Sequence, residues 1–268
     1  MTRFDRDTGV VRLDAASFEA NMSRDWWISR GPNGGYVSAT VLRAMAGVID
    51  DPERAARSFT VHFTAPPSEG PVRIETALER SGRSMTTVTA RLLQDGRLCA
   101  LAIAAFSRSR SGPEFQDARM PEVVPPERAE PIPSDGRPMR ERYETRSALP
   151  ELAESDGQPA RSGGWIRLRE PQPADPFVVA ALADAWPPAA RGRGWPDGTP
   201  VMRGFPTVDI TVHFRATLPH PGLPHDAFLL AQFQTRFLRH GFLEEDGEIW
   251  TPDGTLLAHS RQLGVLLQ

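Results

Sequence analysis

Two segments of the chain share the sequence TVHF and the same alternation of apolar and polar residues. In residues 58–63 every second residue is apolar, and in residues 209–214 the apolar positions are Ile210, Val212 and Phe214. An alternation of period two places the apolar side chains on one face of a β-strand. Each segment is therefore predicted to be a strand with one buried face.

The similarity between the two segments extends beyond these four residues. Each TVHF is followed by a Pro-rich turn, two strand-like segments, an Asp-Gly pair and a last strand. The copies lie 151 residues apart at TVHF (211 minus 60) and 158 apart at the pairs Asp95-Gly96 and Asp253-Gly254 (253 minus 95). Asp-Gly is a strong hairpin signal. The shared order predicts a duplicated unit whose second copy has longer loops.

A helical segment precedes each set of strands. Residues 34–49 read GGYVSATVLRAMAGVI, with apolar residues near helical spacing and small residues between them. This composition is typical of a helix packed tightly inside a curved sheet. Residues 175–186 form the second predicted helix, with Asp175 as N-cap and Pro176 in the first turn. Each copy is predicted to be an antiparallel sheet wrapped around one helix.

The two copies are separated by a segment rich in Pro, Glu, Arg and Ser, with PEVVPPERAEPIPSDGRP at its centre. Such a composition is typical of a linker. We therefore expect an N-terminal repeat over residues 1–108, a linker over 109–162 and a C-terminal repeat over 163–268.

Composition narrows the functional classes. The 268 residues include 40% hydrophobic residues, 31 basic residues and 34 acidic residues, without a long run of either sign. A nucleic-acid or anionic-membrane partner therefore has no electrostatic support. A single cysteine, Cys99, excludes a disulfide within the chain and favours a cytoplasmic location. No membrane span or signal core is expected, and neither a metal-ligand spacing nor a phosphate-binding loop is present, so no metal or cofactor is predicted.

The motifs NGGYVSATVLRAM, RSFTVHFTAPP, TVDITVHFRA and GEIWTPDGTLLAHSRQL occur in this order along the chain. In this respect the chain resembles the type II acyl-CoA thioesterases with a double-hotdog fold. The resemblance implies an α+β fold in which two tandem repeats form one continuous sheet. It also implies hydrolysis of an acyl-CoA to a fatty acid and CoA by an activated water, without a covalent intermediate.

The resemblance also implies a set of catalytic residues. In this family a carboxylate, a hydroxyl and a glutamine of the second repeat orient the attacking water. These roles fall on Asp209, Thr235 and Gln262 of this sequence. Alternation places Asp209 on the strand face opposite Ile210. Near Thr235 the loop length departs from the family pattern.

The first repeat lacks most of this set, because the counterpart of Asp209 is Ser58 and that of Gln262 is Ala104, while Thr235 is matched with Thr76. The first repeat instead contributes a Gly-rich helix start. Free N–H groups at a helix N-terminus, approached closely through glycine, suit a developing oxyanion. The residues expected to bind the oxyanion or substrate are Asn33, Gly34, Gly35 and Tyr36. One composite site at the interface of the repeats is predicted.

Two other functions are also consistent with the sequence. A hotdog hydratase or dehydratase would use an Asp-His pair, and Asp209 and His213 share a strand face. A non-catalytic acyl-CoA-binding protein would keep the binding tunnel without the polar residues. The length of the acyl chain, the choice between CoA and acyl carrier protein, and self-association to a homo-oligomer are not decided by the sequence.

Overall fold

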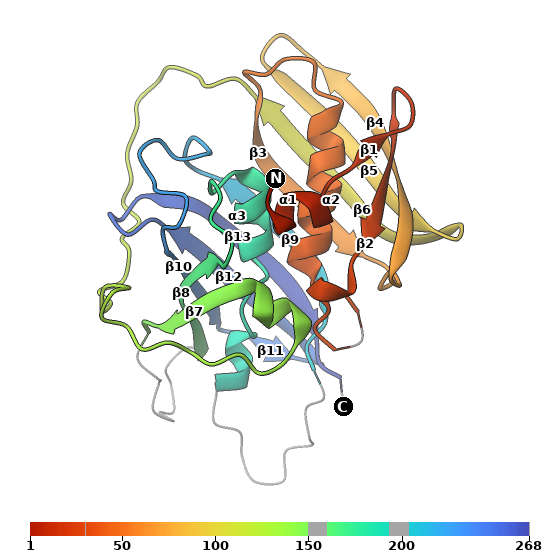
Figure 1. The fold of residues 1–268 in the computed structure, drawn as a ribbon. Coiled ribbons are helices and arrows are strands. Elements are labelled where there is room, and N and C mark those ends of the chain that lie inside the picture. The colour runs from red at the N-terminus through yellow and green to blue at the C-terminus, as the bar shows by residue number, and fades with distance from the viewer. Residues whose placement is uncertain (30, 150–159, 193–203, 268) are drawn as a thin grey trace.

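The computed structural model describes residues 1–29, 31–149, 160–192 and 204–267, which form one large antiparallel sheet with helices on its inner face (Figure 1). The elements of the first repeat are α1 (Arg3–Asp7), β1 (Val11–Arg12), β2 (Ser17–Met22), η1 (Arg24–Trp26), α2 (Gly34–Gly47), β3 (Ala55–Phe63), β4 (Gly70–Ser81), β5 (Met85–Gln94) and β6 (Arg97–Ser107).

The remaining elements begin inside the predicted linker, which contributes a short helix, the strand β7 and the start of β8. They are η2 (Pro138–Arg142), β7 (Tyr143–Ser147), β8 (Ala160–Leu168), α3 (Pro176–Leu182), η3 (Ala189–Gly192), β9 (Thr207–Phe214), β10 (Leu229–Thr235), β11 (Leu238–Arg239), β12 (Phe242–Trp250) and β13 (Leu256–Val265). No helix in the described parts of the chain is long and apolar enough to cross a membrane.

The two TVHF segments pair with each other at the centre of the sheet. The strand order is β1-β2-β4-β5-β6-β3-β9-β13-β12-β10-β8-β7, and Thr60 of β3 lies directly opposite Thr211 of β9, with their hydroxyl oxygens 2.9 Å apart. These threonines hold the same position in the two copies. The order of strands on one side of this point therefore repeats on the other, which confirms the predicted continuous sheet of two repeats.

The two predicted helices lie against the inner face of the sheet. Helix α2 begins at Gly34, where the Asn33 side chain accepts a hydrogen bond from the N–H of Tyr36. Helix α3 begins at Pro176, where the Asp175 side chain caps the first turn. It ends four residues before the predicted end at Trp186. The chain beyond it leads into two prolines at 187 and 188, which do not continue a helix.

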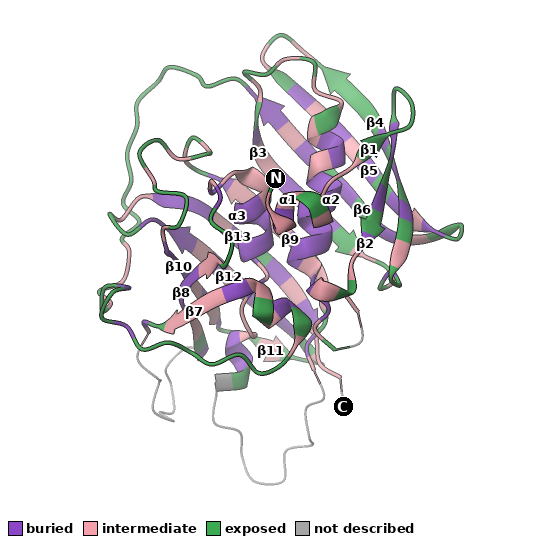
Figure 2. Ribbon diagram, in the orientation of Figure 1, coloured by how far each residue is buried: buried purple, intermediate pink, exposed green. Residues whose placement is uncertain are grey.

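Helices α2 and α3 approach each other closely at Gly35. A Cβ atom added to Gly35 would lie 2.2 Å from the backbone oxygen of Ala181. This distance is too short for any side chain, so glycine is required for the contact between the two repeats. The surrounding core is continuous across both repeats, and buried residues follow the inner face of the sheet (Figure 2).

The outer face differs between the repeats. In the second repeat, Trp165, Leu230 and Trp250 form a separate buried cluster beneath the linker, and the Trp165 indole donates to the backbone oxygen of Val124. In the first repeat, Leu101 and Ile103 of β6 are exposed. The linker therefore serves as a cover for one half of the outer face.

The close contact at Gly35 leads to a prediction about stability. We expect Gly35→Ala to lower the free energy of unfolding by about 2 kcal/mol or more, because the methyl group has to push α2 away from α3. The melting temperature should fall by about 4 °C or more. Thermal unfolding of Gly112→Ala serves as the control, since a Cβ at Gly112 meets no atom within 4 Å. Equal melting temperatures for the two variants would contradict the close-contact argument.

Candidate functional site

Three polar side chains form a row across the inner face of the second repeat. Glu245 of β12 lies directly opposite Gln262 of β13. Thr235 of β10 follows Gln234, which pairs with Asp246, so Thr235 lies opposite Glu245. All three residues are buried. The structure thus brings Thr235 and Gln262 together, with a glutamate between them that was not predicted.

A fourth polar residue, Asp184, follows α3 and faces the start of α2. Its Oδ2 accepts hydrogen bonds from the N–H of Gly35 at 3.1 Å and from Asn33 Nδ2 at 3.0 Å. Its Oδ1 lies 3.3 Å from the hydroxyl of Thr207, and that hydroxyl lies 3.0 Å from Gln262 Oε1. Thr207 therefore links the Asp184 carboxyl group to the row of side chains on the sheet.

The row continues from Gln262 to a second carboxyl group. Gln262 Nε2 donates to Glu245 Oε1 at 2.6 Å, and the N–H of Ala189 in η3 donates to Glu245 Oε2 at 2.6 Å. Asp184 and Glu245 are therefore connected through one hydroxyl group and one amide group. The connection spans both repeats, because Asn33 and Gly35 belong to the first.

Burial changes the acidity of both carboxyl groups. Desolvation raises the pKa of Asp184 to about 6, against the opposing effect of the hydrogen bonds it accepts. Asp184 retains some accessible surface, but its carboxyl group lies among protein atoms. Desolvation also raises the pKa of Glu245 to about 7, and the negative charge of Asp184 adds to the increase. Carboxyl groups that titrate near neutral pH are typical of sites that transfer protons.

Asp209 does not lie beside the inner-face side chains Thr235 and Gln262. Asp209 pairs with Leu263, whereas Gln262 pairs with Ile210, so the side chains of Asp209 and Gln262 lie on opposite faces of the sheet. Its carboxylate is on the outer face, 3.9 Å from the Nδ1 atom of His62. The expectation that Asp209 joins Thr235 and Gln262 is therefore wrong in its placement. Asp184 is the carboxylate that the fold places beside them.

A sequence signal for both missed carboxyl groups exists. Asp184 interrupts the apolar run FVVAALADAW, and Glu245 occupies the inward-facing position between Leu243 and Gly247. An acidic residue in an otherwise buried pattern is costly unless it has partners. Such an interruption is a better guide to a buried site than a carboxylate at the start of a strand.

The predicted helix-start residues divide into two groups. Asn33, Gly34 and Gly35 surround Asp184, and a Cβ at Gly34 would lie 2.8 Å from Asp184 Oδ2. Tyr36 lies elsewhere: its hydroxyl donates to the backbone oxygen of Asp7, and its ring stacks on Trp26. The Gly35 N–H donates a hydrogen bond to Asp184. That this N–H binds the oxyanion stays a prediction.

The Thr235 hydroxyl faces the Glu245 carboxyl group but has no hydrogen bond of good geometry to a described residue. Its Oγ1 is buried and makes no hydrogen bond with any of the described residues. Buried hydroxyl groups normally have a partner. The Thr235 hydroxyl is therefore available to a bound water or substrate beside Glu245.

The same row in the first repeat is apolar. Ala104 pairs with Phe59 as Gln262 pairs with Ile210, and its neighbour on β5 is Val88. Val88 in turn faces Leu78, while Thr76 faces Ala90, so Leu78 is the counterpart of Thr235. The predicted match of Thr235 with Thr76 is therefore wrong. Thr235, Glu245 and Gln262 thus correspond to Leu78, Val88 and Ala104.

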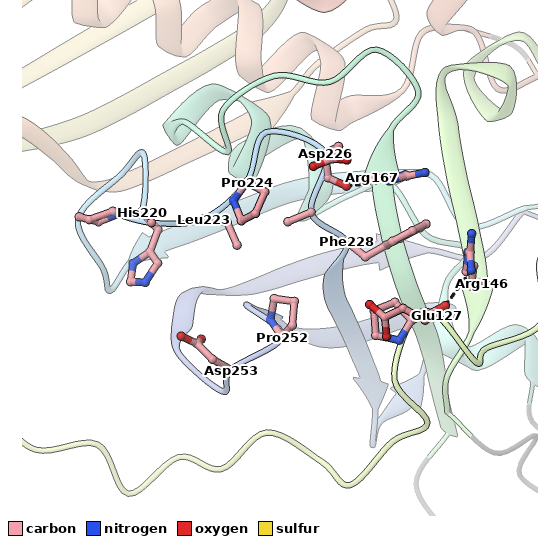
Figure 3. A pocket seen from close by; sticks show the side chains of 14 residues that line it. Glu127, Arg146, Arg167, His220, Leu223, Pro224, Asp226, Phe228, Pro252 and Asp253 are labelled. Carbon is pink, nitrogen blue, oxygen red and sulfur yellow. Dashed lines mark hydrogen bonds between the residues drawn. The ribbon is translucent and has the colours of Figure 1, made fainter.

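A cleft of about 730 Å³ lies elsewhere, on the outer side of the second repeat (Figure 3). The guanidinium groups of Arg146 and Arg167 lie over the ring of Phe228 in its wall, and both form ion pairs with Glu144. None of the residues of the inner-face site lines this cleft.

Among the described residues no group of three or more His, Cys, Asp or Glu side chains has the geometry of a metal site.

Comparison with known protein families supports the two-repeat organisation. Residues 23–107 match the model of the acyl-CoA thioesterase N-terminal domain, and residues 118–266 match that of the acyl-CoA thioesterase C-terminal domain. The chain belongs to the acyl-CoA thioesterase family. The resemblance drawn from the sequence motifs is thereby confirmed.

Solved structures show the same fold over the full length of this thioesterase. A conserved hot dog protein of unknown function from Alicyclobacillus acidocaldarius is 29% identical, with a TM-score of 0.85 over 100% of this chain and 99% of the other. A proposed thioesterase II from Thermobifida fusca YX is 27% identical, with the same TM-score over 100% and 98%. The acyl-CoA thioesterase II TesB2 of Mycobacterium marinum, 21% identical with a TM-score of 0.78 over 99% and 97%, shares the fold. The double-hotdog prediction is confirmed.

A curated relative matches a shorter stretch. The thioesterase-like protein TwmA of Talaromyces wortmannii is 31% identical over 97 residues, which are 35% of this chain and 28% of that protein. The match therefore spans less than a third of the relative's length.

The raised pKa of Asp184 leads to a prediction about pH. The pKa of Asp184 is about 6 in the folded protein and about 3.8 in the unfolded chain. The folded state therefore binds the proton more tightly, and this stabilises the fold fully below pH 3.8. The stabilisation is lost as the pH rises through about 6. We expect Asp184→Asn to gain stability relative to the wild type by up to about 2 to 3 kcal/mol between pH 4 and pH 7. Urea unfolding at several pH values measures the difference, and a constant difference would contradict the raised pKa.

Proposed function

We propose that this thioesterase hydrolyses an acyl-CoA to a free fatty acid and CoA, with Asp184 as the base that activates water. The observation that carries the proposal is the hydrogen-bonded connection from the start of α2 through Asp184 and Thr207 to Gln262. It assembles a carboxylate, hydroxyl groups and a glutamine from both repeats. These are the groups that the family resemblance implies, with Asp184 in place of Asp209.

The proposed reaction proceeds by direct attack of water. The water oxygen forms a bond with the thioester carbonyl carbon while its proton passes to the Asp184 carboxylate. The tetrahedral intermediate then collapses, the C–S bond breaks, and the thiolate of CoA takes up the proton that Asp184 holds. A base with a pKa of about 6 is largely ionised at neutral pH and still basic enough to accept the proton.

The start of α2 supports the base electrostatically. Two donors from this helix start, the Gly35 N–H and the Asn33 amide, bind the same carboxylate oxygen. They and the positive end of the helix dipole stabilise the ionised form in a desolvated position. The glycines allow the carboxylate to reach the helix end, because a Cβ at Gly34 would collide with it.

The hydroxyl of Thr207 connects the state of the base to Gln262. A hydroxyl carries one hydrogen, so it donates either to Asp184 or to Gln262 at a given moment. When Asp184 is ionised the hydroxyl turns to it, and the Gln262 oxygen is left to accept a hydrogen bond from the attacking water. Thr235, whose buried hydroxyl has no partner among the described residues, provides a second contact for the water or the thioester.

The alternative functions receive less support. A binding protein has no use for two buried carboxyl groups, which cost stability. An Asp-His pair for hydration chemistry exists between Asp209 and His62, but it lies on the outer face with the imidazole more than half exposed. We further propose that the enzyme acts in the cytoplasm, because its single cysteine, Cys99, is a buried free thiol and the chain has no disulfide.

We expect Asp184→Asn to lower the rate of CoA release from its best acyl-CoA substrate by roughly 100-fold or more, because the base is lost while the shape is kept. Asp209→Asn should change the rate by less than about threefold, since it alters only the outer face. A thiol assay on acyl-CoAs from C2 to C18 measures both variants beside the wild type. The chain-length profile of the wild type identifies the preferred acyl group.

The reverse result, with Asp209→Asn inactive and Asp184→Asn active, would restore the assignment made from sequence motifs. Tight binding of acyl-CoA without cleavage by the wild type would favour the binding protein instead.

A further inference from the structure

Glu245 stands where the duplicated unit has an apolar residue. Its counterpart in the first repeat is Val88, which is completely buried between Leu78 and Ala104 on neighbouring strands. Glu245 is only 1% exposed, so it is as deeply buried as the valine. A buried carboxyl group has a large desolvation cost that a valine lacks. The equivalent position of the first repeat is filled by an apolar residue, so the repeated unit does not require a carboxyl group there for packing.

In the part of the chain that the structure describes, Glu245 accepts hydrogen bonds from two donors and pairs with no cation. Gln262 Nε2 donates to Oε1, and the N–H of Ala189 donates to Oε2. No arginine among the described residues forms an ion pair with it. The nearby Arg191 of η3 lies over the ring of Phe205 instead. Both oxygens of the carboxyl group are thus used as acceptors.

These contacts determine which way the Gln262 amide faces. With its NH₂ group held by Glu245, the amide oxygen points to Thr207, 3.0 Å away, and through it to Asp184. The flipped amide would place its oxygen against the glutamate carboxylate, which repels it, and would leave the NH₂ group toward Thr207. An ionised Glu245 therefore selects the orientation in which an acceptor faces the proposed water.

We infer that Glu245 is a positioning residue whose ionised form fixes the Gln262 amide for water activation and whose protonation releases it. The inference rests on the proposed function for its catalytic consequence, and it adds a second ionisable group on which activity depends. Glu245 acts through Gln262 and does not contact the thioester.

The surroundings of Glu245 explain why its protonation matters near neutral pH. Burial raises its pKa to about 7, and the charged group that faces it from the end of α3 is Asp184. Among the described residues, the groups that face it from the other elements are uncharged: the hydroxyl of Thr235 on β10, the amide of Gln262 on β13 and the N–H of Ala189 on η3. A proton on either oxygen removes the negative charge that the two donors bind and competes with one of them for that oxygen, which weakens the hold on the Gln262 amide. Because the two carboxyl groups interact, their titrations belong to the pair.

The first experiment compares the wild type with Glu245→Gln and Glu245→Val. Valine reproduces the first repeat, so that variant should stay folded. We expect both to lower kcat by about tenfold or more with little change in KM. The rise in kcat expected for the wild type near pH 7 should be lost in both variants, whereas the rise through about pH 6 that depends on Asp184 should remain. Glu244→Gln is the matched control, because Glu244 precedes Glu245 on β12 and lies on the opposite face. It should keep both the rate and the pH profile.

The second experiment needs no substrate. The side-chain NH₂ signals of Gln262, assigned by their absence in Gln262→Met, are followed by ¹⁵N-edited NMR between pH 5 and pH 9. They should shift with a midpoint near neutral pH in the wild type and in Glu244→Gln, and show no such midpoint in Glu245→Gln.

The possible outcomes distinguish a failure of the positioning role of Glu245 from a failure of the proposed function. If the wild type cleaves acyl-CoA and Glu245→Val keeps its kcat and pH profile, the positioning role is refuted and the proposed function stands. If the wild type cleaves no acyl-CoA, the proposed function fails, and the NMR titration still decides whether Glu245 controls Gln262. Identical Gln262 titrations in the wild type and Glu245→Gln would refute the inference in either case.

Discussion

The antiparallel pairing of β3 with β9 is the interaction on which the rest of the structure depends. It joins the sheets of the two repeats edge to edge, with Thr60 opposite Thr211, and so leaves neither edge exposed at the centre. The same pairing places the two helices side by side on one face. The start of α2 then meets the end of α3 at a distance that only glycine permits. A site shared by the repeats is a direct consequence of this geometry.

Duplication supplies two equivalent positions for every residue, and the two repeats have used them differently. Across the inner face the first repeat has Leu78, Val88 and Ala104, whereas the second has Thr235, Glu245 and Gln262. Val88 and Ala104 belong to the core while Leu78 is half exposed, and the polar row is the proposed catalytic site. The first repeat contributes to the site through its helix start, where the Gly35 N–H and the Asn33 amide bind Asp184.

The polar row has a cost in stability that the fold offsets by local hydrogen bonds. Each buried carboxyl group accepts at least two hydrogen bonds, which partly replace the water it has lost. Desolvation still raises the pKa of both toward neutrality. The same burial that destabilises the ionised forms thus brings their titration close to neutral pH, where Asp184 is proposed to accept a proton. A stable core around α2 and α3 makes this arrangement tolerable.

The sequence did not reveal β7 and the start of β8, which lie within the predicted linker. By itself it determined the duplication, the strands of the repeated unit, the two helices with their caps and the polar residues Thr235 and Gln262, because periodicity, capping and hairpin signals are local. It did not determine which carboxylate joins them. Alternation already placed Asp209 on the strand face opposite the apolar Ile210. Only the tertiary structure shows that Gln262 pairs with Ile210 and therefore lies on the other face from Asp209. Asp184 and Glu245 meet through contacts between distant segments. Such contacts depend on strand order and helix packing, and no single local pattern encodes them.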